Sequence, residues 1–247
     1  MKTIFLGTNG WFTTKTGNTT CILIDSKDYY IVLDAGNGIY KLDKYIKENK
    51  QIYLFISHFH ADHISGLQML SLFRFRQGLK IYIQKNAKQI FNIFMNLPFT
   101  FALDKAPYKI EVNEITEGEH LIPFKVTAKK LEHPVPCFGY RFELDGKIIA
   151  YATDTAVCDN DLKLAQNADL LIHECANPPS DMLSNNGHSA PYETAKLAKD
   201  ANVKKLVLMH FAANVYTTLV QRKNAENRAL EVFKKTTASY DDMEMEL

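Results

Sequence analysis

The stretch Ser57-His58-Phe59-His60-Ala61-Asp62-His63 is the most informative part of this sequence of 247 residues. It directly follows residues 52–56, an uninterrupted apolar run that predicts a strand buried on both faces. Packing does not explain three imidazoles and a carboxylate in so short a segment, since loops favour Gly, Asn, Ser and Pro. Imidazole and carboxylate are the ligand types that Zn, Fe and Mn accept. The pattern therefore predicts a metal site at the carboxyl end of a buried strand.

The spacing within this stretch indicates more than one metal ion. Alternation in an extended segment places His58 and His60 on one side, while Asp62 and His63 begin the next turn. The segment can therefore present two ligand pairs in different directions, as two ions require. The alternative interpretation is a solvated polar loop with no bound ion.

The composition describes a packed globule: 46% of the residues are hydrophobic, and there are 11 Gly and 8 Pro. The balance of 29 Lys and Arg against 28 Asp and Glu excludes a protein that binds polyanions by bulk charge, although a local basic patch stays open. Four scattered cysteines without a Cys-x-x-Cys pair predict free thiols in a reducing compartment. Because no apolar run is long enough for a signal peptide or a membrane span, we expect a cytoplasmic protein without membrane partners.

Strand-like and helix-like segments alternate along the chain, which predicts one α/β domain over residues 1–247 with helices covering the sheets. The expected strands are residues 4–6, 20–25, 30–34, 52–56, 80–83, 124–131, 137–144, 147–152, 170–172 and 204–209. The expected helices are residues 39–47, 66–77, 86–96, 191–201 and 223–235.

The pattern His-x-His-x-Asp-His after a strand resembles the metallo-β-lactamase superfamily. This resemblance implies a four-layer αβ/βα sandwich, an α/β fold with its metal site at one edge. Three later segments match the remaining ligands of that family in order, and they supply His133 before Pro134, Asp154 before Thr155, and His210 after Met209. The resemblance implies one ion held by His58, His60, His133 and Asp154. It implies a second ion held by Asp62, His63, His210 and the shared Asp154.

Such a site implies a hydrolase with two divalent metal ions. Zn is the expected metal, and Mn and Fe are the alternatives. Two ions that share a carboxylate lower the pKa of a bridging water to about 7, so a metal-bridged hydroxide is available to attack the substrate. A redox branch of the superfamily has a carboxylate at the position of His60, so this histidine argues against a di-iron oxygen-reducing site.

Two further segments resemble ribonuclease Z-like enzymes, and they are His173-Glu174-Cys175-Ala176 and Gly187-His188-Ser189-Ala190. In that branch, Glu174 would orient His188, which would donate a proton to the leaving oxygen or hold a phosphoryl oxygen. Asp62 would handle the proton of the nucleophile. The alternatives are an exposed strand-end carboxylate for Glu174, and a loop residue that caps the following helix for His188.

The interval between His133 and Asp154 holds one hairpin, whereas ribonuclease Z carries its tRNA-binding arm there. We therefore expect a phosphodiesterase resembling ribonuclease Z without that arm, acting on a small or cyclic phosphodiester or on RNA. The alternative is a metallo-hydrolase of a thioester, lactone or other carbon ester. A third option is a non-catalytic metal-binding or carrier protein. Related enzymes are often homodimers, which leaves a homodimer open here.

Overall fold

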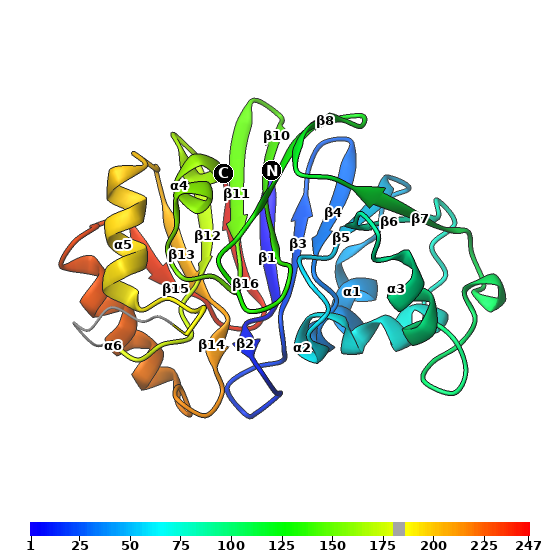
Figure 1. The fold of residues 1–247 in the computed structure, drawn as a ribbon, viewed down its shortest axis with the longest axis horizontal. Coiled ribbons are helices and arrows are strands. Elements are labelled where there is room, and N and C mark those ends of the chain that lie inside the picture. Colours follow the sequence, from blue (N-terminus) through cyan, green and yellow to red (C-terminus); the bar gives the residue numbers. More distant parts are fainter. Residues whose placement is uncertain (180–185) are drawn as a thin grey trace.

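The computed structural model describes residues 1–179 and 186–247, and its centre is a pair of seven-stranded mixed sheets that face each other (Figure 1). The first sheet has the order β16 (Met243–Glu246), β1 (Lys2–Gly7), β3 (Cys21–Asp25), β4 (Tyr29–Leu33), β5 (Gln51–Phe55), β6 (Leu79–Gln84) and β7 (Ile110–Ile115). The second has the order β15 (Thr236–Ala238), β13 (Leu206–Met209), β12 (Leu170–Glu174), β11 (Lys147–Ala152), β10 (Phe138–Leu144), β9 (Lys125–Lys130) and β8 (Gly118–Leu121).

Helices lie on the outer face of each sheet, so the molecule has four layers (Figure 1). The first sheet is covered by α1 (Leu42–Tyr45), α2 (Ala61–Ile64), α3 (Lys88–Phe94) and the 3-10 turns Asn37–Lys41, Ser65–Leu72 and Leu103–Lys105. The second is covered by α4 (Asp159–Ala165), α5 (Pro191–Asp200) and α6 (Leu219–Leu230). This arrangement confirms the predicted four-layer α/β sandwich. The single domain over residues 1–247 stays a prediction.

The core between the two sheets is aromatic. Phe55 of β5 stacks on Tyr82 with ring centroids 4.9 Å apart, and it meets Phe142 of β10 edge to face at 5.0 Å. Phe55 and Phe142 are fully buried. Aromatic contacts of this geometry add to the stabilisation from burying their apolar area. This core holds the two sheets in a fixed relation, which in turn fixes the loops at their common edge.

Parallel strands meet in the part of each sheet that carries the polar motifs. Strands β4, β5, β6 and β7 pair in parallel, and so do β11, β12, β13 and β15. The loops after β5, β11 and β13 therefore leave from the carboxyl ends of parallel strands, where ligands bind in open α/β sheets. A small parallel pair joins the two halves there, β2 (Asn9–Gly10) with β14 (Phe211–Ala212).

Two predicted helices of the first half are shorter and tighter than expected. Residues 39–47 were expected to form one helix, but a 3-10 turn occupies Asn37–Lys41 and only Leu42–Tyr45 is α-helical. The helix expected over residues 66–77 is a 3-10 turn that ends at Leu72. It ends there because the Arg74 guanidinium binds the free carbonyls of residues 71–73, while the rings of Phe73 and Phe75 stack and turn into the core.

The last predicted helix begins earlier than expected. Residues 223–235 were expected, whereas α6 spans Leu219–Leu230 because Thr218 caps it and forms a capping box with Gln221. The sequence patterns did not indicate α4 or the terminal strand β16, which pairs with β1 and ties the two chain ends together. Within the described residues, no helix is long and apolar enough to cross a membrane.

Candidate metal centre

The histidine-rich stretch forms the loop after β5 and continues into α2, which contains Asp62 and His63. Strand β5 lies between β4 and β6 and is buried along almost its whole length, as its apolar run predicts. After the strand, His58 and His63 are fully buried, whereas His60 lies at the surface of the pocket. The three residues expected from the second half arrive on separate loops: His133 after β9, Asp154 after β11 and His210 after β13.

The structure brings the expected first ligand set together. Each of its four residues offers one ligand atom, and these atoms lie within 4.8 Å of one another in the cluster His58, His60, His133 and Asp154. His58 Nε2 lies 3.6 Å from Asp154 Oδ2. His133 Nε2 lies 3.3 Å from His60 Nδ1.

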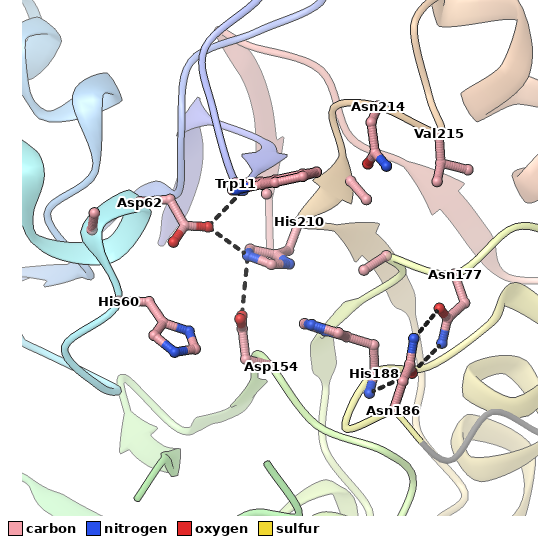
Figure 2. A pocket seen from close by; sticks show the side chains of 14 residues that line it. Trp11, His60, Asp62, Asp154, Asn177, Asn186, His188, His210, Asn214 and Val215 are labelled. Atoms are coloured by element: carbon pink, nitrogen blue, oxygen red, sulfur yellow. Dashed lines mark hydrogen bonds and ion pairs between the residues drawn. The ribbon is translucent and has the colours of Figure 1, made fainter. Parts of the chain in front are cut away.

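The expected second ligand set is also assembled. Asp62, His63 and His210 each place one ligand atom within 4.8 Å of the others. Asp154 reaches this set with its other oxygen: Oδ1 lies 3.2 Å from His63 Nε2 and 3.1 Å from His210 Nε2. The Asp154 carboxylate therefore lies between the two sets, the position expected for a shared ligand, and Figure 2 shows its contact with His210.

Buried partners fix the orientation of two of these imidazoles. His63 Nδ1 donates to Asp34 Oδ2 at 2.8 Å, and the same carboxylate accepts from the Ser57 backbone N–H and the Tyr151 hydroxyl. His133 Nδ1 donates to the carbonyl of Gly187 at 3.1 Å. Each bond engages Nδ1 and directs Nε2 toward the ligand set, which is how outer partners orient metal ligands.

Asp34 is a buried partner of His63 to which the sequence interpretation assigned no role. It ends the buried strand β4, is fully buried and has a left-handed φ of 57°. Asp154 and His210 also have positive φ, of 52° and 50°, at the ends of β11 and β13. An acidic residue before Ala-Gly at the end of an apolar strand is a sequence signal for Asp34.

The electrostatics favour the cation-binding protonation states of His58 and Asp154, but not of His63. Burial lowers the pKa of His58 to about 2, and the neighbouring His63 adds to this effect. Burial acts to raise the pKa of Asp154, but the nearby His210 and His63 outweigh it and hold that pKa well below its ordinary value. Burial opposes a high pKa for His63, yet Asp154, Asp62 and Asp34 raise it well above its usual value. The ligand sets thus combine the neutral His58 imidazole with the ionised Asp154 carboxylate, whereas a metal ion would have to displace a proton from His63.

The donor set fits divalent metal ions. His58 Nε2 is buried without a hydrogen-bond partner, and it faces other lone-pair donors rather than an N–H or O–H group. A buried polar atom of this kind is costly unless something satisfies it. Imidazole nitrogens and carboxylate oxygens that converge in this way are the ligands of Zn, Mn and Fe sites.

Beside the ligand sets, Glu174 and His188 form the pair expected from the sequence. Glu174 ends β12, is fully buried and accepts the backbone N–H groups of Thr155 and Ala176. Its Oε1 accepts His188 Nδ1 at 2.7 Å, and the His188 ring borders the pocket (Figure 2). Burial lowers the pKa of His188, but the hydrogen bond with Glu174 outweighs it and raises that pKa to about 9.

Both alternatives for this pair disagree with the structure. Glu174 is not an exposed strand-end carboxylate, since none of its surface is accessible. His188 does not cap α5, whose N-cap residue is Ala190. Glu174 touches His188 and backbone amides and does not line the pocket, so it is a positioning residue rather than a group in contact with substrate.

His173, to which the sequence assigned no role, is buried against the carboxylate of Asp161. Its Nε2 donates to Asp161 Oδ2 at 2.9 Å, and its Nδ1 donates to the backbone carbonyl of Glu174 at 2.8 Å. Burial lowers the pKa of His173, but the Asp161 carboxylate outweighs it and raises that pKa to about 9. The pair connects α4 to the end of β12, at the residue that precedes Glu174.

A pocket of about 590 Å³ opens over both ligand sets (Figure 2). Its polar lining residues beyond the predicted ones are Asn177, Asn186 and Asn214, and the indole of Trp11 lies at its rim. The backbone N–H of Trp11 donates to Asp62 Oδ2 at 2.6 Å. Sequence interpretation missed these residues because single Asn and Trp residues in loops carry no recognisable spacing.

The chain is similar over its whole length to proteins named ribonuclease BN. It is 29% identical to that of Citrobacter koseri and 27% identical to that of Salmonella gallinarum, each over 305 residues that cover 98% of both chains. Among solved structures, the metallo-β-lactamase fold protein YhfI from Bacillus subtilis superimposes with a TM-score of 0.81 at 25% identity, covering 99% of this chain and 98% of YhfI.

The short form of human tRNase Z, ELAC1, superimposes with a TM-score of 0.77 at 25% identity, covering 100% of this chain and 99% of ELAC1. The family model of the β-lactamase superfamily domain matches residues 29–211. These findings confirm the expected resemblance to ribonuclease Z-like proteins and the expected enzyme class. The chain belongs to the β-lactamase superfamily and is a metal-dependent hydrolase with the metallo-β-lactamase fold.

Proposed function

We propose that this protein is a metal-dependent phosphodiesterase that hydrolyses RNA or small nucleotide phosphodiesters. The observation that carries this proposal is the Glu174–His188 pair, which places a hydrogen-bonded imidazole beside two ligand sets at the floor of one pocket. Ribonuclease BN and tRNase Z are the names of relatives and neighbours that span the whole chain, and they support the same substrate class.

The proposed metal assignment follows the two ligand sets. His58, His60, His133 and Asp154 would hold one ion, and Asp62, His63, His210 and the shared Asp154 would hold the other. We propose zinc, while manganese and iron suit the same donors. When bound, two such ions supply Lewis acidity and make water acidic enough to provide a nucleophile at neutral pH.

The protein's own residues would then move two protons. Asp62 borders the pocket and its carboxylate would accept the proton of the attacking water. As the new P–O bond forms and the bond to the leaving group breaks, His188 would donate its Nε2 proton to the leaving oxygen. Glu174 would keep His188 in place through Nδ1, so that Nε2 faces the substrate.

The size of the chain favours a small substrate or a short segment of RNA. The alignment with ribonuclease BN extends over 305 positions, whereas this chain has 247 residues, so the relative carries segments that this chain lacks. Between His133 and Asp154 this chain has only the β10–β11 hairpin, where a tRNA-binding arm would be expected. The homodimer stays a prediction.

The decisive experiment combines metal analysis with a substrate panel. We expect two ions per chain and hydrolysis of bis(p-nitrophenyl) phosphate or cyclic nucleotides. His188→Ala should keep both ions and lose about 10²- to 10⁴-fold in rate, the usual contribution of general acid catalysis. His120→Ala is the matched control. His120 lies on the edge strand β8, where its imidazole bonds the Thr116 carbonyl, and it does not line the pocket.

The alternative outcomes separate the competing functions. Hydrolysis confined to a lactone or thioester, with no effect of His188→Ala, would contradict the phosphodiesterase and favour a carbon-ester hydrolase. If the fully metallated protein turns over no ester at all, a non-catalytic metal-binding protein becomes the better interpretation.

A further inference from the structure

Trp11 has an unusual backbone conformation at the rim of the pocket. Its φ is 74°, and the other described non-glycine residues with positive φ are all Asp, Asn or His. This region is disfavoured for a bulky side chain. A glycine would give the same N–H to Asp62 without that penalty. The backbone contact alone therefore does not account for an indole at this position.

The indole is not held there by packing in the core. Trp11 is 66% exposed, and the next residue, Phe12, is 43% exposed. The two rings meet edge to face with centroids 5.4 Å apart, so Phe12 supports the indole from one side. An exposed aromatic face that borders a pocket is available to stack with a flat ligand group.

The path of the backbone brings Trp11 next to the ligand sets. At Gly10, a Cβ atom would lie 2.5 Å from Cε1 of His210, so only glycine lets β2 run this close to the imidazole. The next residue is Trp11, and its ring lies on the same side of the pocket as His210 and Asn214 (Figure 2). Trp11 therefore directly follows the residue that contacts His210, a proposed ligand of the second metal ion.

The charge of the pocket argues against recognition of a polyanion. Among the described residues that line it, none is Lys or Arg. Its walls instead offer the amides of Asn177 and Asn214, the indole and small apolar side chains. Such a surface suits a group that is flat, uncharged and able to form hydrogen bonds, and a nucleobase has these properties.

We propose that Trp11, supported by Phe12, is a stacking platform for the nucleobase adjoining the scissile phosphodiester, so that the substrate class is short nucleoside phosphodiesters. This inference rests on the proposed phosphodiesterase function and narrows it. The phosphate would lie over the ligand sets, and the base would extend over the indole toward the asparagines.

The first test uses binding rather than turnover. Trp11 is the only tryptophan, so the intrinsic indole fluorescence of the metallated protein reports directly on this position. We expect uridine monophosphate to quench this fluorescence saturably, while ribose phosphate, which lacks the base, leaves it unchanged. Equal responses to the two ligands, or no response to either, would overturn the platform.

The second test compares two substrates with the same leaving group, thymidine p-nitrophenyl phosphate and methyl p-nitrophenyl phosphate. Trp11→Gly keeps the backbone N–H and removes the ring, so kcat/KM should fall roughly 5- to 150-fold for the thymidine substrate only. Trp11→Phe should restore most of that loss. Phe99→Gly is the matched control, because Phe99 is 63% exposed and does not line the pocket.

The two tests separate this inference from the function on which it rests. An equal fall for both substrates, or none for either, would overturn base stacking even if the protein is a phosphodiesterase. If neither substrate is hydrolysed but uridine monophosphate still quenches Trp11, the platform stands and the proposed reaction fails.

Discussion

The two halves of the sandwich build the candidate metal centre in different ways. In the first half, His58, His60, Asp62 and His63 all come from one short segment after β5, the loop and the first turn of α2. In the second half, His133, Asp154, His188 and His210 come from four separate loops after β9, β11, β12 and β13. In both halves, however, ligands follow parallel strands whose carboxyl ends lie at the same edge of the sandwich.

This difference shows which part of a site a chain can specify locally. The loop after β5 needs only a short-range turn to bring its side chains together. The second half needs the register of β11, β12 and β13 to be correct, since a parallel neighbour brings together residues far apart in sequence. Its ligands are therefore only as well placed as the sheet that carries them.

Each half also places a buried carboxylate behind the site. In the first half, Asp34 holds His63, which itself faces the ligand sets. In the second half, Asp161 holds His173, which does not line the pocket and bonds the backbone carbonyl of Glu174. We therefore expect changes in the first half to alter metal binding, and changes at His173 to alter stability.

The largest effect should come from the residue that joins the halves. Asp154→Ala removes the carboxylate between both ligand sets, so both ions should bind poorly and phosphodiester hydrolysis should fall about 10³-fold or more. Metal content per chain and the hydrolysis rate are the measurements, with the exposed Asp159→Ala as control. Two ions retained by the Asp154 variant would show that this carboxylate is not shared.

The next effect should come from the buried partner in the first half. Asp34→Asn keeps the shape but weakens the bond that orients His63, so metal affinity should fall about 10- to 100-fold. Competition with a chelating dye measures the affinity. Tyr151→Phe, which removes one donor to the same carboxylate, should have a smaller effect. An unchanged affinity for Asp34→Asn would mean that packing alone orients His63.

The His173–Asp161 pair should make stability depend on pH. The pKa of His173 is raised from 6.5 to about 9 by the fold, so its stabilising contribution is complete below pH 6.5 and is lost as pH rises through about 9. Between pH 7 and pH 9 the free energy of unfolding should fall by about 2 kcal/mol more than in His173→Gln. Urea unfolding at both pH values tests this, and parallel pH profiles for the two proteins would contradict it.

The smallest effect should come from the strand that links the halves. Gly10→Ala places a methyl group against the His210 ring, so the imidazole must shift and the hydrolysis rate should fall about tenfold. Gly146→Ala is the control, because Gly146 lies in the β10–β11 hairpin and a Cβ atom added there would meet no atom within 4 Å. Its φ of 71° strains the backbone of this variant without contact to the site. Equal rates for the two variants would show that β2 does not position His210.

Much of the fold follows from patterns in the sequence. Strands with a continuous apolar run, such as β5, and the β10–β11 hairpin marked by Asp145-Gly146 appear where they were predicted. The helices of the first half were less predictable, because the burial of Phe73 and Phe75 in the core overrides the helical propensity of residues 66–77. The strand β16 escaped prediction because its partner, β1, lies at the other end of the chain.

The sequence alone determined the chemistry of the candidate site: a dense group of imidazoles and carboxylates after a buried strand has few physical explanations other than a cation. It also indicated Glu174 and His188. Only the tertiary structure revealed the roles of Asp34, His173 and Trp11, since each depends on a contact with a residue elsewhere in the chain. Ligand type is a property of residues, whereas orientation, burial and protonation belong to the packed environment, which forms only when the two sheets come together.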